Sequence, residues 1–356
     1  MTRYRDLYTA QDLPIFQNRM YGSEQEAIHC PKGNIRLVED LETGLLYNLD
    51  FQPELMVYDE HYQNDQTSSS TFQAHLENVA DIIDDTMKSE VILEIGCGKG
   101  RFMDLLLGRG VNVIGVDPTY EGESDRVIKE YFTADLDLRG DGIVLRHVLE
   151  HIQNPYDFLC MVRDANGGSG KIYIEVPCFD WICAQNAWFD IFYEHVNYFR
   201  EADFHRMFGT VHRSGKVFSG QYIYVVAELA SLRPPVYRET DAADCSAAFF
   251  GKLPELPVQP GSQTRRIVWG AASKGVIFSL MSKRRGQAVD TIIDISPGKQ
   301  GRYIPATGLR VHAPEDILST IPDGSIVHVM NSNYMSEIKA MSHNRFTYVG
   351  IDNIAC

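Results

Sequence analysis

Hydrophobic and polar positions alternate regularly along the middle of the chain, from about residue 91 to residue 230. Short apolar runs end at glycines or acidic residues, and helix-like segments follow them. This alternation is typical of a parallel sheet with helices on both faces. The predicted strands of this unit cover residues 91–95, 111–117, 142–148 and 171–177. Residues 211–230 predict two further strands, paired antiparallel at the edge of the sheet.

Two helices of this unit have recognisable starts. Ser70 and Gln73 have the spacing of a capping box, and apolar residues then recur at helical spacing up to Met87. Asn154 and Pro155 predict the N-cap and first turn of a helix that reaches about Ala165. The apolar residues of both helices are expected to pack in the core.

A proline-rich stretch separates this unit from a second one. Residues 233–262 contain five prolines and end in Gly261 and Ser262, which indicates a linker. The alternation then restarts, with strands predicted at 265–270, 289–296, 325–331 and 346–352. We therefore expect an α/β fold with two Rossmann-like units and an irregular N-terminal segment. The expected boundaries are 1–70 for the N-terminal segment, 71–232 for the first unit, 233–262 for the linker and 263–356 for the second, smaller unit.

Composition excludes several classes of protein. Hydrophobic residues make up 44% of the 356 residues, which is ordinary for a globular protein. The net charge of −15 argues against a binder of duplex nucleic acid and against docking on anionic lipid. No apolar run approaches the ~18 residues of a membrane span, and no secretory signal is visible. Seven scattered cysteines without a C-x-x-C pair indicate a reducing, cytoplasmic location.

A glycine-rich loop joins the first predicted strand to a helix. It has the sequence Glu94-Ile95-Gly96-Cys97-Gly98-Lys99-Gly100, and Asp117 ends the next strand. Glycines let the backbone approach a ligand, and a helix N-terminus presents free N–H groups. Asp117 stands where a carboxylate accepts both hydroxyls of a ribose. The acid before the loop would repel a pyrophosphate, so a dinucleotide is disfavoured.

This stretch resembles the first motif of the class I S-adenosylmethionine-dependent methyltransferases. The resemblance implies that Glu94 helps hold the methionine ammonium and that Gly96 and Gly98 pass under the cofactor. It also implies that Asp117 holds the ribose and Asp135 contacts the adenine. The segment HVLEHI, from His147 to Ile152, matches the part that flanks the methyl donor, so His147 is a further cofactor candidate.

The segment after the 171–177 strand carries the most chemistry. It includes Tyr193-Glu194-His195, which places an imidazole beside a carboxylate and a phenol at the carboxyl end of the sheet. Histidine suits general-base catalysis near neutral pH. A histidine buried behind the sheet is the alternative interpretation.

The pattern E-H-x-x-Y-F at this place resembles the C-methyltransferases of nucleotide-linked keto-deoxysugars. The stretch from Tyr58 to Asn64 is similar to their segment that closes over the cofactor, which makes Tyr62 a cofactor candidate. VWGAASKG, DISPGKQGRYIPATG and MNSNYMSEI are similar to their C-terminal domain. The resemblance implies a catalytic group of His195, Tyr193 and Glu194. The candidate substrate-binding residues are Asn197, Tyr198, Lys274 and Lys299.

The N-terminal segment departs from that family, which usually begins with a zinc module built on four cysteines. Cys30 is the only cysteine before Cys97, and His29 and Cys30 supply two ligands where a structural zinc needs about four. We therefore expect no bound metal. A second glycine loop, residues 270–275, precedes Asp294 in the same way that the first loop precedes Asp117. It suits either a phosphate of the acceptor or a purely structural or dimerising role.

The sequence thus predicts a C-methyltransferase that uses S-adenosylmethionine and acts on a nucleotide-linked keto-deoxysugar. His195 would remove the proton beside the ketone, Glu194 would orient His195, and Tyr193 or Tyr198 would stabilise the enolate. The alternatives are O- or N-methylation of another small metabolite, or a cofactor-binding protein without transferase activity. The expected partner is the nucleotide sugar, with no nucleic acid and no membrane, and the sequence leaves a homo-oligomer open.

Overall fold

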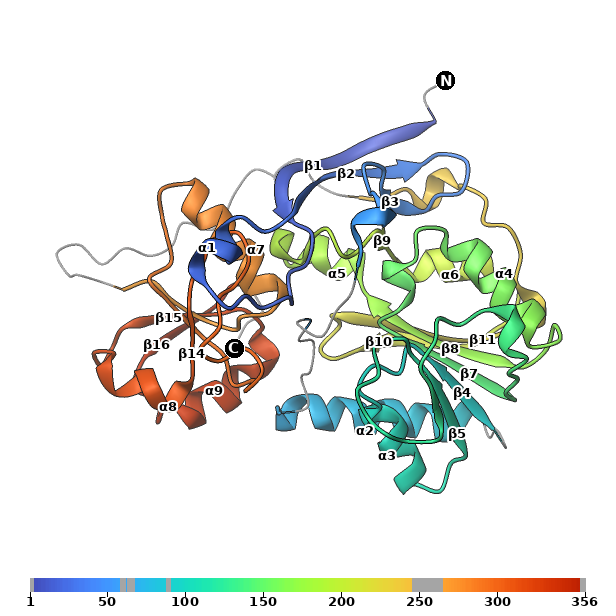
Figure 1. Cartoon of the computed structure of the whole chain (residues 1–356). Helices are drawn as coiled ribbons and strands as arrows, with labels where there is room; N and C mark the ends of the chain where they lie inside the picture. Colours follow the sequence, from blue (N-terminus) through green and yellow to red (C-terminus); the bar gives the residue numbers. More distant parts are fainter. Residues whose placement is uncertain (1–2, 58–61, 63–67, 88–90, 245–264, 353–356) are drawn as a thin grey trace.

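Three β-sheets organise the computed structural model, which describes residues 3–57, 62, 68–87, 91–244 and 265–352. Most of the cofactor-closing segment expected at residues 58–64 and most of the expected linker lie outside these residues. Among the described residues, no helix is long and apolar enough to cross a membrane. Figure 1 shows two bodies side by side, with the N-terminal strands along one side of both.

The central sheet has seven strands in the order β10-β11-β8-β7-β4-β5-β6. The strands are β4 (Ile92–Ile95), β5 (Val113–Val116), β6 (Val127–Ile128), β7 (Gly142–Arg146), β8 (Lys171–Pro177), β10 (Val211–Val217) and β11 (Tyr222–Glu228). β4 to β8 are parallel, and β10 and β11 form the expected antiparallel edge. The order reverses between β4 and β7, so the crevice at their carboxyl ends is where such a sheet binds ligands.

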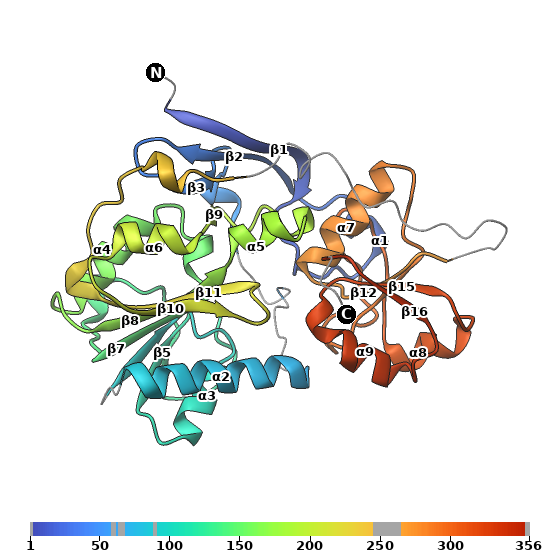
Figure 2. The same cartoon turned by 180° about the vertical axis from the view of Figure 1, so that it is seen from behind.

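Helices cover both faces of this sheet, as Figures 1 and 2 show. One face carries α2 (Ser70–Thr86) and α3 (Arg101–Gly108); the other carries α4 (Pro155–Ala165), α5 (Phe179–Ala184) and α6 (Glu201–Met207). Successive residues of β7 alternate between two cores, because Val144 packs with α2 and α3 whereas Ile143 and Leu145 pack in the other cluster. The N-cap of α2 is Ser69, whose Oγ accepts the N–H of Phe72, and not Ser70 as the sequence suggested.

The C-terminal body contains a five-stranded parallel sheet in the order β14-β13-β12-β15-β16. Its strands are β12 (Ile267–Trp269), β13 (Thr291–Ile293), β14 (Val311–His312), β15 (Ile326–Val329) and β16 (Thr347–Gly350). Its helices are α7 (Ser273–Arg284), α8 (Pro314–Ile317) and α9 (Met335–Met341). The Rossmann-like architecture of both bodies is confirmed, and β14 is added to the four strands expected here.

The N-terminal segment, expected to be irregular, instead contains three strands and a short helix. β1 (Tyr4–Pro14), β2 (Lys32–Asp40) and β3 (Leu46–Asn48) form a sheet with β9 (Asn197–Tyr198), and α1 spans Glu24–Ile28. The alternation of this segment is weak, because register shifts interrupt the pairing of β1 with β2. The fourth strand comes from residues about 150 positions downstream, which no local pattern reveals.

A buried ionic cluster fastens this N-terminal sheet to α6. Arg200, at the N-cap of α6, donates to the carbonyl oxygen of Gly44 at 2.6 Å and to the Asp203 carboxylate at 3.0 Å. Its guanidinium also lies 3.3 Å from Glu39 of β2. Arg206 donates to the same Gly44 carbonyl and to Asp203. Gly44 has a φ of +77°, and a Cβ there would lie 2.9 Å from Arg206, so glycine is required for this turn.

Replacing Arg200 with alanine should lower the free energy of unfolding by about 3–5 kcal/mol, because it leaves buried carboxylates without their cation. The matched control is Arg109→Ala, which removes an arginine that pairs with three exposed acids, Glu77, Asp81 and Asp84. That change should cost about 1 kcal/mol or less. Urea denaturation of both variants measures the difference, and equal losses would contradict the structural role of the buried cluster.

Candidate active site

The glycine loop lies at the crevice between β4 and β7. Gly96 has a φ of +77°, and a Cβ there would come within 2.3 Å of the Val148 side chain. The loop after β4 therefore packs directly on the loop after β7, which only glycine allows. Gly98 also has a positive φ, but a Cβ there would meet nothing within 4 Å. The backbone at Gly98 is thus open on the side where a ligand would approach.

Asp117 follows β5 and is held against this loop. Its Oδ2 accepts the N–H of Gly98 at 2.8 Å, and its Oδ1 accepts the N–H and the hydroxyl of Thr119, both at 2.7 Å. A carboxylate oxygen offers two lone pairs, so Oδ2 can accept one further hydrogen bond, whereas Thr119 already uses both lone pairs of Oδ1. These contacts fix the orientation of the carboxylate beside the glycine loop, and its expected contact with a ribose stays a prediction.

Glu94, on β4, is buried with 2% of its surface exposed, and its Oε2 has no hydrogen-bond partner among the described residues. Burial raises the pKa of its carboxyl to about 8, although the charge of Arg146 opposes the shift. A buried carboxylate without a partner is costly unless a cation pairs with it. The residues therefore fit a ligand that brings an ammonium group to Glu94 and a ribose to Asp117, as S-adenosylmethionine does.

The other cofactor candidates lie at different depths. Asp135 is in an exposed 3-10 turn, Ala134–Leu136, and the adenine contact expected of it stays a prediction. His147 directly follows β7 with a φ of +53°. Its ring packs against Tyr222 and lies 3.3 Å from Glu150 and 3.2 Å from Glu175. These two carboxylates outweigh burial and raise the pKa of His147 to about 9, so the ring is a cation at neutral pH.

His195 lies between the 3-10 turn Trp188–Asp190 and β9. The centroid of its ring is 4.1 Å from that of Phe192 and 5.0 Å from that of His151. Burial, followed by the charges of His151 and His147, holds the pKa of His195 well below its ordinary value. His195 is therefore a neutral imidazole with a lone pair, which is the form that a general base requires.

The carboxylate of Glu194 takes its hydrogen bonds from the N-terminal segment, not from His195. It accepts the backbone N–H groups of Gln17 and Asn18 and the hydroxyl of Tyr62, the last at 2.7 Å. We expected the charge of Glu194 to orient the His195 ring, but these hydrogen bonds join the carboxylate to the N-terminal segment instead. The backbone carbonyl of Glu194 instead accepts a hydrogen bond from Nδ1 of His151 at 2.8 Å.

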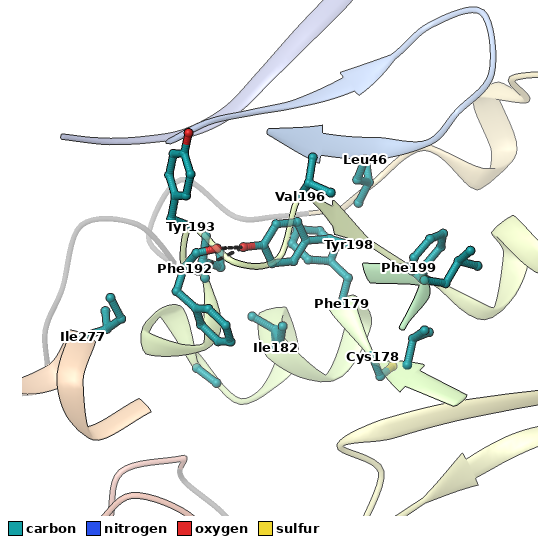
Figure 3. Packing of buried hydrophobic residues seen from close by; sticks show 14 of the residues in the cluster. Leu46, Cys178, Phe179, Ile182, Phe192, Tyr193, Val196, Tyr198, Phe199 and Ile277 are labelled. Atoms are coloured by element: carbon teal, nitrogen blue, oxygen red, sulfur yellow. Dashed lines mark hydrogen bonds between the residues drawn. The ribbon is translucent and has the colours of Figure 1, made fainter. Parts of the chain in front are cut away.

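Three further candidates shape the loop around His195. The Tyr193 side chain points toward the N-terminal sheet, where its hydroxyl accepts the N–H of Gln52 at 2.9 Å (Figure 3). The Tyr198 hydroxyl accepts the N–H of Phe192 at 3.0 Å and donates to the carbonyl oxygen of Phe192 at 3.1 Å. Backbone groups thus engage both hydroxyls, and their expected role in stabilising an enolate stays a prediction. Asn197 donates to the carbonyl oxygens of Leu149 and Ile152, which fixes the HVLEHI segment beside this loop.

The two lysine candidates differ in their surroundings. Lys274, at the start of α7, lies 3.1 Å from the Asp190 carboxylate and donates to Gln221 at 3.2 Å. It therefore joins the C-terminal body to the segment that leads to His195. Lys299 is only 4% exposed, and its ammonium lies 3.9 Å from Asp294. This side chain is therefore turned inward, and the substrate contact expected of Lys299 stays a prediction.

Sequence reasoning missed the contact of His151 with His195 and the part played by Gln17 and Asn18. His151 belongs to the HVLEHI segment, but 44 positions separate it from His195, so the sequence does not indicate that the two rings are in contact. The N-terminal contacts use backbone N–H groups, which leave no signal in side-chain identity.

Comparisons with known proteins agree with this geometry. Residues 68–211 match a family described as a methyltransferase domain, and residues 258–351 match one described as a C-methyltransferase C-terminal domain. A curated relative, the C-methyltransferase NovU from Streptomyces niveus, is 22% identical across 78% of this chain and 76% of its own length.

Two solved structures that are similar to this chain each cover less than half of it. A SAM-dependent methyltransferase from Archaeoglobus fulgidus is 18% identical, covers 45% of this chain and 95% of its own, and has a TM-score of 0.34. The 1,6-didemethyltoxoflavin-N1-methyltransferase from Burkholderia thailandensis is 17% identical, covers 46% of this chain and 79% of its own, and has a TM-score of 0.33.

The two domain matches and the curated relative thus agree with a crevice that holds a buried acid, an open glycine loop and a carboxylate fixed beside that loop. This chain is an S-adenosylmethionine-dependent methyltransferase.

Proposed function

We propose that the enzyme methylates a carbon atom next to a ketone in a nucleotide-linked deoxysugar, with His195 as the general base. The observation that carries the proposal is the position of the His195 ring after β8, packed against His151 and Phe192, where burial lowers its pKa. A carbon nucleophile needs a base that removes a C–H proton, which transfer to an oxygen or nitrogen does not require. The C-methyltransferase descriptions of the C-terminal match and of NovU support the same choice.

The position of His195 relative to the cofactor site follows from two contacts. Its ring lies against His151, in the segment after β7, and Val148 of the same segment packs on Gly96 of the glycine loop. The proposed base and the glycine loop thus both pack on the segment that follows β7. An acceptor held between them has its reacting carbon beside the imidazole and within reach of the methyl donor, so alignment supplies much of the rate enhancement.

The reaction then divides between the cofactor and the chain. S-adenosylmethionine supplies an electrophilic methyl group on a positively charged sulfur. The lone pair of His195 takes the proton from the carbon beside the ketone, and the C–H electrons move into an enolate on the acceptor. The enolate carbon would form the new bond to the methyl group as the bond from that methyl group to sulfur breaks, so that the sulfur would keep the electron pair, S-adenosylhomocysteine would leave and the abstracted proton would stay on His195. Phe192 and His151 keep water away from the imidazole and hold its orientation.

Glu194 acts as a positioning residue in this scheme. Its carboxylate holds the backbone of residues 17 and 18 and the Tyr62 hydroxyl over the loop that carries His195. Its carbonyl oxygen fixes the ring of His151, which packs on His195. Lys274 is proposed to contribute to the acceptor site from the C-terminal body, beside Asp190.

Binding of the cofactor product should release a proton through Glu94. At a pH of about 6.5 its carboxyl is mostly protonated, because its pKa is about 8, whereas pairing with an ammonium requires the carboxylate. Binding of S-adenosylhomocysteine should therefore release up to about one proton at that pH and progressively fewer as the pH rises through 8. Calorimetry in buffers of different ionisation enthalpy measures this release. A release that persists in Glu94→Gln would show that another group titrates.

Asp117→Ala should weaken binding of S-adenosylmethionine by about ten-fold or more, since each charge-assisted hydrogen bond to ribose contributes roughly 1.5–3 kcal/mol. The control is Asp125→Ala, which removes an exposed acid from the loop after β5. Calorimetric affinities, with thermal denaturation to confirm folding, compare the two variants. An unchanged affinity in folded Asp117→Ala would remove this carboxylate from the site.

His195→Ala should lose both methyl transfer and exchange of the acceptor's carbon-bound proton, by about 10²–10⁴-fold. Exchange is measured by mass spectrometry of a keto-deoxysugar nucleotide in deuterated water, with S-adenosylhomocysteine in the cofactor site. Cofactor affinity should change little, because the glycine loop is separate from His195. Glu194→Gln should cost less, because the imidazole remains, and His205→Ala, an exposed histidine of α6, should have no effect.

Two results would count against the proposal. Exchange that survives in His195→Ala would assign the base to another residue. Absence of exchange in the natural protein, together with methylation on oxygen or nitrogen, would favour a heteroatom methyltransferase on the same scaffold.

A further inference from the structure

A group of potential metal ligands lies around His195, beside the segment that follows β7. Glu150, His151 and His195 each place one potential ligand atom within 4.8 Å of the others, and they form the only such group of three found among the described residues. Two histidines and one glutamate are a ligand set that holds zinc in enzymes with an open fourth position. Spacing along the chain does not indicate this group, because His195 lies more than 40 residues from the other two.

The carboxylate of Glu150 lacks a partner on one side. Glu150 is 1% exposed, and its Oε2 has no hydrogen-bond partner among the described residues. Its Oε1 lies 3.3 Å from Nδ1 of His147. A ligating carboxylate is commonly anchored in this way through its other oxygen. The unpaired oxygen is therefore the atom that Glu150 offers to a cation.

The rings of His151 and His195 pack against each other, and a hydrogen bond fixes the orientation of His151. Nδ1 of His151 lies 2.8 Å from the carbonyl oxygen of Glu194, which can only accept a hydrogen bond. In the neutral ring the proton is thus on Nδ1, and Nε2 keeps its lone pair. Metal-bound histidines usually donate their other ring N–H to a backbone carbonyl in the same manner. His195 is packed against His151 and supplies the second imidazole.

We propose that Glu150, His151 and His195 bind a divalent transition-metal ion such as Zn²⁺, and that the bound ion switches the enzyme off. Ligand atoms around tetrahedral zinc lie roughly 3.4 Å apart, so the separations of at most 4.8 Å need to shorten by no more than about 1.4 Å on binding. The ion occupies the lone pair of His195, which then cannot take a proton. This inhibitory consequence rests on the proposed role of His195, whereas binding of the ion does not.

The binding experiment uses the full chain, freed of any affinity tag and treated with a chelator, and titrates it with Co²⁺ as a spectroscopic substitute for Zn²⁺. One equivalent should produce the visible absorption of low-coordinate Co²⁺, and Zn²⁺ should abolish that absorption. Glu150→Gln and His151→Ala should each weaken Co²⁺ binding by at least about ten-fold. His205→Ala is the matched control, because it removes an exposed histidine that faces Glu201 and has no third ligand within the part of the chain that the structure describes.

The outcomes separate this inference from the proposed function. Absence of the Co²⁺ absorption, or equal binding by Glu150→Gln and the natural protein, would overturn the metal site even if His195 catalyses proton exchange. If Co²⁺ binds as expected but proton exchange is absent, the proposed base fails and the metal site stands. Where both hold, Zn²⁺ should abolish exchange in stoichiometric amounts and a chelator should restore it; exchange that persists with zinc bound would overturn the inhibitory role.

Discussion

The buried carboxylate of Glu194 is the constraint on which the arrangement of the site depends. Its oxygens hold the backbone of residues 17 and 18 and the hydroxyl of Tyr62, while its own carbonyl fixes His151. A buried carboxylate is tolerated only when hydrogen bonds replace its lost water. The N-terminal segment supplies those hydrogen bonds, so it cannot move away without leaving that charge unsatisfied.

The same N-terminal segment also contacts the C-terminal body. Tyr21 exchanges two backbone hydrogen bonds with Tyr303, and the N–H of Ala306 donates to the carbonyl of Ala27. Asn18 donates to the hydroxyl of Ser273, at the start of α7. The segment therefore bridges the two Rossmann-like bodies and passes over the loop that carries His195, so the placement of the bodies and of the base are coupled.

Each of the two bodies has an aspartate that binds two backbone N–H groups beside a glycine loop, but the surroundings of the two aspartates differ. Asp117 accepts the N–H of Gly98 and, through its other oxygen, the N–H of residue 119; Asp294 accepts the N–H groups of Ala271 and Ser296 in the same pattern. Around Asp117 the loop is open beside Gly98, whereas Lys299 is buried against Asp294. A carboxylate that already faces an internal ammonium has less capacity for a ligand. This contrast is consistent with cofactor binding in the first body.

The sequence by itself determined both Rossmann-like bodies and the glycine loop with Asp117, because alternating patterns and glycine turns are local properties of the chain. It also marked Glu194 and His195, although it assigned the contacts of Glu194 to the wrong neighbour. Only the tertiary structure decided that the N-terminal segment forms a sheet with β9 and that the Tyr193 hydroxyl binds the backbone of Gln52. It alone placed Glu150 and His151 beside His195. These contacts join residues that lie far apart in the chain, and several of them use backbone groups. They arise because helices and strands pack together in space. The spacing of side chains along the sequence does not reveal such packing.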